Sequence, residues 1–566
     1  MRVACVSTLM RRSRRALAVA LVVATVPPVT GCYHYRLQSH LRAHRKLAEQ
    51  TIQKRRERGE QSLEVPPLPP TSCVAPHVWH YNHYLCCTDV TTLDAPPDEA
   101  QAVEHFRNAI LNHQRIHTLG AAHTGNDGIC TKGMVLRTTN LNHALRIENF
   151  HGHPTVVAEA GITIYDLNQW LHERGYSLGM GTLEFRDASI AGAIATGAHG
   201  STLRGSSVLS SQVESLWIAT PADVVAQGSA FREAREFSAD NLPPIEWRAM
   251  RTGLGLFGLV TKVRLRIEKE FNLDVRITTN EDSGLLAPGG LERIAGDCDW
   301  GQIIWFPRIH RYVAMCGART DKDVDREAEN ILLTPDAVQW EADMFIGLLN
   351  QMVRSKGDYC PEDIRDFALE TTPPQRKRCL GMLHSVTRAI GYAYKMVSSA
   401  MSPLQLSAPQ NDFEVAIPMA KSEAVLKLIS HTVERENLCL PLTGVFLRFT
   451  RADETALIAH STADADAPNG SGMVFVEYVV FRPNGTAPNA GDSVFGPYWR
   501  LTERLIREFG GRLHWGKNQR DLFTFQRDQN GLYRQRLDQF REIIERFDPT
   551  HILATPFSDA VGLTQP

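Results

Sequence analysis

Residues 117–124 read His117-Thr118-Leu119-Gly120-Ala121-Ala122-His123-Thr124, and residues 189–200 read Ser189-Ile190-Ala191-Gly192-Ala193-Ile194-Ala195-Thr196-Gly197-Ala198-His199-Gly200. Both stretches consist mainly of small residues and lie at the ends of apolar runs, which predicts two glycine-containing loops. Small side chains allow backbone N–H groups to approach a bound anion closely. The spacing and flanks differ from the Walker and dinucleotide-binding motifs. The two loops therefore indicate an anion cradle of another kind.

In this order, the two loops resemble the pyrophosphate-binding loops of flavoenzymes of the vanillyl-alcohol oxidase superfamily, which have a PCMH-type FAD-binding domain. The resemblance implies FAD as cofactor. It implies that FAD is held by Gly120, Ala121, Ala122, His123, Thr124, Ser189, Gly192, Thr196, Gly197, His199 and Gly200. In that superfamily the histidine at the position of His123 is often bonded covalently to FAD, so both covalent and non-covalent binding are open here.

The C-terminal half carries a narrower resemblance. Residues 444–453, Gly510-Gly511-Arg512-Leu513-His514-Trp515-Gly516-Lys517 and Asp548-Pro549-Thr550 are similar to segments of the aldonolactone oxidase group. That group includes L-gulonolactone oxidase, D-arabinono-1,4-lactone oxidase and the alditol oxidases. The resemblance implies oxidation of a CH–OH group of a sugar lactone or related alcohol. Hydride would pass to flavin N5, and oxygen would be the acceptor, giving hydrogen peroxide.

By the same resemblance, Arg448 and Lys517 line the sugar pocket and His514 lies beside the cofactor. Arginine offers a fixed fork of donors to sugar oxygens. A lysine near the flavin favours its anionic form or holds the reacting hydroxyl. Ser189 resembles a serine on the substrate side or the flavin side, and the alternative for Ser189 is a helix cap.

One position departs from the family pattern. Phe446 stands where the group usually has a glutamate, two residues before Arg448 and on the same face of a strand. A hydrogen-bonding partner for a sugar is therefore missing. Either Glu477, on another predicted strand, replaces it, or the substrate is less polar than a plain lactone or polyol.

The composition is that of an ordinary globular protein with two or three domains. The chain has 566 residues, of which 43% are hydrophobic and 22% charged, and its net charge is −2. This balance gives no reason to expect a nucleic-acid partner. The 11 cysteines include no C-x-x-C pair, and the pairs His80/His83 and His151/His153 have no further ligands at a useful spacing, so no metal site is expected.

The N-terminus has the pattern of an export signal. Arg11, Arg12, Arg14 and Arg15 precede a short apolar run at residues 16–26, and Val29-Thr30-Gly31-Cys32 follow it. The last four residues resemble a bacterial lipobox, which would place a lipid on Cys32, and residues 13–17 weakly resemble a twin-arginine signal. An uncleaved anchor is the alternative. We expect an exported protein attached to a membrane through its N-terminus.

The expected fold class is α+β, with a PCMH-type FAD-binding domain of two α+β subdomains and a cap domain that combines an antiparallel sheet with helices. The expected divisions are 1–32 as export signal, 33–76 as polar and proline-rich linker, 77–270 as FAD-binding domain, 271–500 as cap, and 501–566 as a C-terminal segment returning to the FAD domain. Residues 322–405, mostly helical in pattern, are expected to be an insertion in the cap.

Local patterns predict individual elements. Apolar spacing predicts a helix at residues 98–113, and Thr163 with Asp166 has the spacing of a helix start. A further helix is expected at 497–509, ending at Gly510-Gly511. Residues 253–258 fit G-x-G-x-x-G, but no apolar strand precedes them, so a second nucleotide site is rejected.

Two other functions remain open. The first is a membrane-attached flavin dehydrogenase that passes electrons to a quinone or cytochrome. The second is a catalytically inactive binding lipoprotein on the same fold. The intact loops, His123 and Lys517 favour an enzyme.

Overall fold

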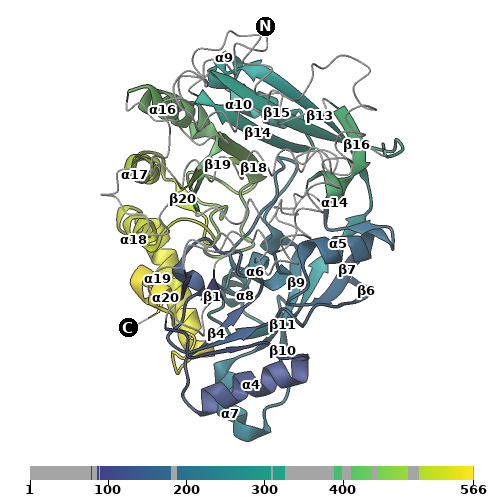
Figure 1. Ribbon diagram of the computed structural model, residues 1–566, viewed down its shortest axis with the longest axis vertical. Coiled ribbons are helices and arrows are strands. Elements are labelled where there is room, and N and C mark those ends of the chain that lie inside the picture. The colour runs from purple at the N-terminus through teal and green to yellow at the C-terminus, as the bar shows by residue number, and fades with distance from the viewer. Residues whose placement is uncertain are drawn as a thin grey trace, which may run out of the picture.

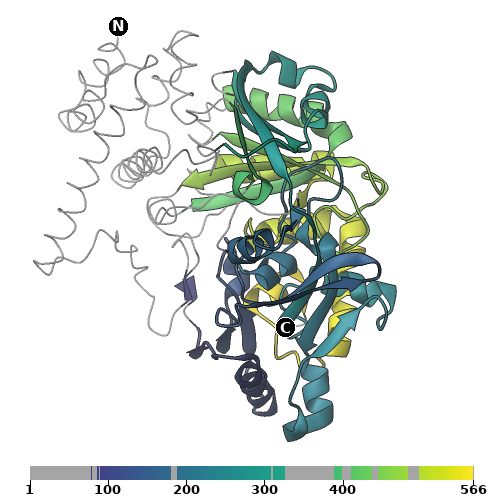
Figure 2. The same cartoon turned by 90° about the vertical axis from the view of Figure 1, so that its right-hand side faces the viewer.

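The computed structural model describes residues 78–79, 86–87, 89–179, 188–307, 310–325, 388–397, 410–435, 444–481 and 496–564. Two halves stack along the long axis, one containing strands β3 to β11 (residues 92–266) and the other a large sheet (Figures 1 and 2). The predicted export signal and linker lie outside the described residues. In the described part, no helix is long and apolar enough to cross a bilayer.

The N-terminal half contains a parallel and an antiparallel sheet. The parallel sheet has the order β3 (Thr92–Asp94), β5 (Met134–Arg137), β4 (Ile116–Leu119). The antiparallel sheet has the order β10 (Arg235–Ser238), β9 (Val213–Ala219), β11 (Leu259–Arg266), β7 (His153–Glu159), β6 (Ala144–Phe150). The first glycine-containing loop leaves the end of β4, and the second contains the short helix α6 (Ile190–Ala195).

The predicted helix starts are present. Helix α4 (Glu99–Leu111) begins at Asp98, whose side chain accepts from the backbone N–H of Gln101. Its apolar stripe, which includes Val103 and Phe106, is buried. Helix α5 (Ile164–His172) begins at Thr163, whose hydroxyl accepts from the N–H of Asp166. Residues 253–258 form a turn between α8 (Pro244–Met250) and β11, so no βαβ unit follows them.

The other half is built on one antiparallel sheet of eight strands. Their order is β16 (Arg388–Tyr392), β13 (Asn272–Glu281), β15 (Arg311–Thr320), β14 (Trp300–Phe306), β18 (Val445–Arg451), β19 (Gly472–Phe481), β17 (Gln410–Pro418), β20 (Arg512–Leu513). On one face, apolar side chains such as Val415, Leu447 and Val476 join the main core. Because side chains alternate along a strand, the residues between them point to the opposite face.

The prediction of mostly helical structure at residues 322–405 is wrong near the C-terminal end of that range. Residues 388–392 form strand β16, which pairs with β13, and α14 (Ala393–Met396) follows. Ala389 is buried while Arg388 is exposed, which is the alternation of an edge strand. A short edge strand is stabilised by pairing with its neighbouring strand. Because that neighbour is distant in the sequence, the local residue pattern does not reveal the pairing. Residues 326–387 and 398–409 lie outside the described residues.

The C-terminal segment contacts both halves. Helix α17 (Gly496–Phe509) packs on β17 and ends before Gly510, whose φ is +69°. Strand β20 then joins the edge of the cap sheet. Helices α18 (Arg520–Gln529), α19 (Gly531–Phe547) and α20 (Pro556–Val561) follow, and α19 contacts α7 (Pro221–Gln227) and α8. The segment therefore returns to the N-terminal half only after adding a strand to the other sheet (Figure 1).

Candidate active site

A cleft with two adjoining parts is lined mainly by the N-terminal half and the C-terminal segment, and Arg448 of β18 joins the lining of the smaller part. The larger part, about 1100 Å³, is walled by both glycine-containing loops, the turn at residues 253–258 and Phe557. The smaller part, about 730 Å³, lies between the same loops and the C-terminal segment. Both parts share Gly120, Thr124 and Gly192. An elongated ligand could therefore occupy the two parts at once.

The two loops are held against each other by a serine. The Oγ of Ser189 accepts a hydrogen bond from the N–H of Ala121 at 3.3 Å. A Cβ at position 120 would lie 1.8 Å from this Oγ, so only glycine fits there. Ala122 has φ of +60°, a left-handed conformation that is uncommon for alanine. The backbone before His123 is thus bent into an unusual shape at the wall of the cleft.

Most of the predicted site residues line this cleft. Gly120, Ala121, Ala122, His123, Thr124, Ser189, Gly192, Thr196, His199, Arg448, His514 and Lys517 do so. Gly197 and Gly200 are not among the lining residues. Gly197, with φ of +68°, packs beside the ring of His460, and the carbonyl of Gly200 lies 2.8 Å from Nδ1 of His199. Ser189 occupies the N-cap position of α6 but makes no capping hydrogen bond.

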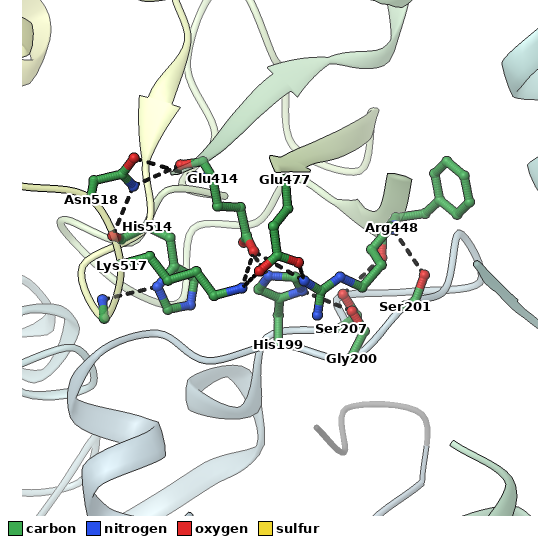
Figure 3. Close-up of polar contacts among 12 residues, drawn as sticks. His199, Gly200, Ser201, Ser207, Glu414, Arg448, Glu477, His514, Lys517 and Asn518 are labelled. Carbon is green, nitrogen blue, oxygen red and sulfur yellow. Dashed lines mark hydrogen bonds and ion pairs between the residues drawn. The ribbon is translucent and has the colours of Figure 1, made fainter. Parts of the chain in front are cut away.

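Four charged side chains, Glu414, Arg448, Glu477 and Lys517, form a buried group that we call the charged quartet (Figure 3). Nζ of Lys517 lies 2.5 Å from Oε2 of Glu414, and Nη2 of Arg448 lies 3.2 Å from the same oxygen. Glu477 contacts both Lys517 and Arg448. None of the four is more than 8% exposed. Strands β17, β18 and β19 supply three of them on the face away from the main core.

Ion pairing keeps Glu414 ionised despite its burial. Burial alone would raise the pKa of Glu414, but Lys517, His199 and Arg448 hold that pKa well below its usual value. Burial lowers the pKa of Lys517, and Glu414 opposes this effect. Lys517 is therefore easier to deprotonate than a surface lysine.

Three buried histidines surround Glu414. Nε2 of His199 lies 2.6 Å from Oε1 of Glu414, and the rings of His460 and His514 are 5.4 and 5.5 Å from the His199 ring. Burial lowers the pKa of His460 to about 3. One potential ligand atom from each of these four residues lies within 4.8 Å of the others.

The hydrogen bonds disfavour a cation among these four residues. Nδ1 of His514 accepts from the N–H of Gly516 at 2.9 Å, so the other nitrogen of a neutral ring carries hydrogen and has no lone pair for a metal. Lys517 and Arg448 already neutralise Glu414. The geometry fits a protein-internal polar network better than a metal centre.

Comparisons with known proteins identify the family. Residues 92–225 match the family model of an FAD binding domain, and residues 263–561, more than half of the chain, match that of D-arabinono-1,4-lactone oxidase. The chain belongs to the D-arabinono-1,4-lactone oxidase family. It is an FAD-dependent oxidoreductase with the α+β fold of PCMH-type flavoenzymes.

Similar proteins include both oxidases and dehydrogenases. L-gulonolactone oxidase of Mus musculus is 23% identical over 82% of this chain and 94% of its own length. L-gulono-1,4-lactone dehydrogenase of Mycobacterium tuberculosis is 24% identical over the same shares, 82% and 94%. Cholesterol oxidase from Brevibacterium sterolicum has a similar fold, with a TM-score of 0.66, 15% identity and coverage of 86% of this chain and 96% of that one.

The residues of the cleft fit the cofactor of this family. FAD needs an elongated site with closely approaching backbone for its diphosphate and polar groups at both ends. The two loops supply the backbone, and His117 supplies a buried polar atom, since its Nδ1 has no partner among the described residues. Burial lowers the pKa of His117 to about 4, so its ring is neutral. The loops and His117 would hold the cofactor, and Lys517, Arg448 and His123 would meet its other end.

Glu477 contacts Arg448 and lies across the sheet from Phe446. Phe446 lies directly opposite Glu477 in the register of β18 and β19. Phe446 is half-buried and packs against an apolar cluster that includes Ile304. Glu477 instead points into the quartet and is 4% exposed. The structure brings the carboxylate of Glu477 into contact with Arg448, as the first of the two alternatives requires.

Sequence reasoning missed Glu414, His117 and His460 as site residues. Glu414 lies in β17 between the apolar residues Phe413 and Val415, and this single acidic residue was the available signal. His117 is the first residue of the stretch 117–124 that leads into the first loop. His460 comes from an irregular segment after β18, and nothing in its local sequence points to the cleft.

Proposed function

We propose that the protein oxidises a CH–OH group of a sugar lactone or a related alcohol. The single observation that carries this proposal is the meeting of Lys517 and Arg448 with both glycine-containing loops in one cleft. Its relatives include L-gulonolactone oxidase and D-arabinono-1,4-lactone oxidase, which supports a lactone as substrate. When bound, FAD would accept a hydride at N5.

The protein's own side chains would orient the substrate. Arg448, which is paired with two carboxylates, lines the smaller part of the cleft and would face substrate oxygens. Lys517 lines the same part of the cleft and would contact the reacting hydroxyl, and its lowered pKa suits proton acceptance. Both side chains are buried, which limits their contact with bulk water.

Oxygen is the electron acceptor that we propose first, with hydrogen peroxide as product. A quinone or cytochrome is the second candidate, because the relative from Mycobacterium tuberculosis is named a dehydrogenase. The retained quartet argues against an inactive binding lipoprotein, since buried charges without a use are costly to keep.

We further propose covalent attachment of FAD through His123, because His123 lines the smaller part of the cleft next to Ala122. Acid denaturation tests the link. A yellow pellet supports it, and complete release of the flavin into the supernatant contradicts it while leaving non-covalent binding intact.

We also propose export and membrane attachment through the N-terminus. Disulfides join Cys87 to Cys130 and Cys298 to Cys316, and disulfides persist in oxidising compartments. Fractionation of cells expressing the full chain tests this proposal. Wild type should be found with membranes and Cys32→Ser should change processing, whereas a soluble cytoplasmic wild type would contradict it.

The test of the reaction is anaerobic mixing of the holoenzyme with L-gulono-1,4-lactone, D-arabinono-1,4-lactone and a panel of alditols. Loss of the visible flavin absorbance identifies a substrate. Re-oxidation by oxygen, with peroxide measured, is then compared with re-oxidation by a quinone. If no lactone or alcohol bleaches a fully loaded protein, the proposal is wrong.

A further inference from the structure

Gln302 is a deeply buried amide in β14, where its side chain is 1% exposed. Neither the oxygen nor the nitrogen of this amide has a hydrogen-bonding partner among the described residues. Burying an amide without hydrogen bonds is costly, and an apolar side chain of similar length would avoid that cost. Packing alone therefore does not account for a glutamine at this position.

The register of the cap sheet places Gln302 beside Arg448. Ile303 pairs with Leu447 in the antiparallel ladder of β14 and β18, and both side chains belong to the main core. Gln302 directly precedes Ile303, and Arg448 directly follows Leu447. Because side chains alternate along a strand, Gln302 and Arg448 lie on the same face, opposite to the main core.

The end of the second glycine-containing loop meets the sheet at the same point. The hydroxyl of Ser201 donates to the carbonyl of Gly301 and accepts from the N–H of Phe449 at 3.0 Å (Figure 3). Gly301 directly precedes Gln302, and Phe449 directly follows Arg448. A single hydroxyl thus holds the backbone next to Gln302 and the backbone next to Arg448 together.

Gln302 lies at the border between an apolar and a charged region. On the β15 side its partner is Met315, which belongs to the same apolar cluster as Trp300 and Ile304, the residues two positions before and after it. On the β18 side is Arg448 of the charged quartet. An amide both donates and accepts, so a hydroxyl is a group that satisfies it.

Deep burial does not separate this position from the cleft. Arg448 is only 3% exposed and still lines the smaller part of the cleft. Opposite residues of an antiparallel pair have Cβ atoms about 5 Å apart. A ligand that contacts Arg448 therefore brings its adjoining atoms within reach of the Gln302 amide.

We propose that Gln302 binds one hydroxyl of the substrate, on a carbon other than the one that is oxidised, and thereby determines which lactones or alcohols are accepted. The amide oxygen accepts from this hydroxyl, or the amide nitrogen donates to it. Because Met315 and Ile304 flank the amide, the substrate presents a single hydroxyl on a carbon frame at this point. The inference rests on the proposed function, since it requires a CH–OH substrate beside Arg448.

The test combines the removal of one side chain with the removal of one hydroxyl. Wild type and Gln302→Met, both as holoenzyme, are bleached anaerobically by the best lactone or alditol and by its monodeoxy analogues, each lacking one hydroxyl that is not oxidised. In wild type, one analogue should need a concentration about fivefold higher, or more, for half-maximal bleaching. In Gln302→Met this difference should disappear. Limiting bleaching rates should stay within about twofold, because a contact away from the reacting carbon affects binding.

Thermal unfolding separates substrate binding from a structural role. Since the amide has no partner among the described residues, Gln302→Met should keep the melting temperature of wild type or raise it. Gln302→Leu, a smaller apolar replacement, is measured alongside and should behave in the same way. A lowered melting temperature in both variants, with an equal loss of bleaching for every probe, would show a structural role and overturn the proposal.

Thr432→Val is the matched control. Thr432, in helix α16 (Ser422–Arg435), is also buried and its hydroxyl also lacks a partner among the described residues, but it lines neither part of the cleft. Its preference among the probes should equal that of wild type. If Gln302→Met keeps the wild-type preference, the inference is wrong and the proposed function stands. If no lactone or alcohol bleaches wild type, both are wrong.

Discussion

Lys517 lies between two buried carboxylates, and both its structural and its chemical contributions follow from that position. Its Nζ contacts Glu414 and Glu477, and the side chain is 8% exposed. Removing a charge from such a group leaves its partners unpaired, which costs about 3–5 kcal/mol. A variant with a shortened side chain at position 517 would therefore lose activity both through destabilisation and through the missing chemical group. Substitutions that separate these two effects are needed.

Lys517→Arg keeps the charge and should preserve flavin content and melting temperature. Because a guanidinium stays protonated, it cannot accept a proton from the substrate. Turnover should fall by about a hundredfold or more, on the order of 3 kcal/mol. Lys517→Met should lose turnover and also lower the melting temperature. Steady-state kinetics and thermal unfolding of both variants make the comparison, and wild-type turnover in Lys517→Arg would remove Lys517 as proton acceptor.

Ser189→Ala tests whether Ser189 belongs to the cofactor cradle or to the reacting groups. The variant loses the 3.3 Å hydrogen bond to the N–H of Ala121, worth about 1 kcal/mol. FAD retention should weaken by about fivefold, while the turnover of fully loaded enzyme should stay within about twofold. Apoprotein titration and kinetics measure the two quantities. A hundredfold fall in turnover at full loading would instead place Ser189 beside the substrate.

At the scale of elements, strands β17, β18 and β19 carry the acidic and basic groups of the site on neighbouring positions. Glu414 lies opposite Glu477, and Glu477 lies opposite Phe446. Cross-strand neighbours of like charge are destabilising unless cations lie between them. Arg448 and Lys517 supply those cations, so the sheet tolerates Glu414 and Glu477 side by side. No cation of the quartet is left to pair with a third carboxylate.

Phe446→Glu should therefore destabilise the protein rather than improve it. The new carboxylate would face Glu477 directly and would lose the packing of Phe446 against Ile304. We expect a loss of about 1–3 kcal/mol in the free energy of unfolding. The double variant Phe446→Glu/Glu477→Gln should recover part of that loss. It should also oxidise lactones faster than the single variant Glu477→Gln. Denaturant unfolding and flavin bleaching test both points, and a Phe446→Glu variant as stable as wild type would contradict the account.

At the scale of the whole molecule, the site exists because three regions meet. The first loop is fastened to the C-terminal segment by the N–H of Gly125, 2.6 Å from the carbonyl of Gly516, and by Asn126, which donates to the carbonyls of Trp515 and Lys517. The same segment pairs with the cap sheet through β20. Lys517 is thereby positioned by both halves. The folded assembly also buries several histidines in neutral form.

Burial of His460 makes stability depend on pH. Its pKa is lowered to about 3 in the fold and lies near 6.5 in the unfolded chain. Below about pH 6.5 the unfolded chain takes up a proton that the fold does not, so this contribution to stability is complete above that pH and is lost as the pH falls towards 3. The slope is up to about 1.4 kcal/mol per pH unit for one histidine. His460→Gln should flatten the dependence of unfolding free energy on pH between about 6 and 4. An unchanged slope would contradict a neutral buried His460.

The sequence by itself determined the family, the cofactor, most of the elements and the two loops of the cleft. These follow from local patterns, namely small residues at loop positions, helix starts such as Asp98, and the run from His514 to Lys517. The tertiary structure alone decided that Glu477 points into the site beside Arg448, that residues 388–392 are a strand, and that Glu414 and His199, 215 positions apart, share a contact. The physical reason is that strand register, edge pairing and long-range ion pairs depend on neighbours distant in the chain. Periodicity along one segment contains no information about which segment will lie beside it.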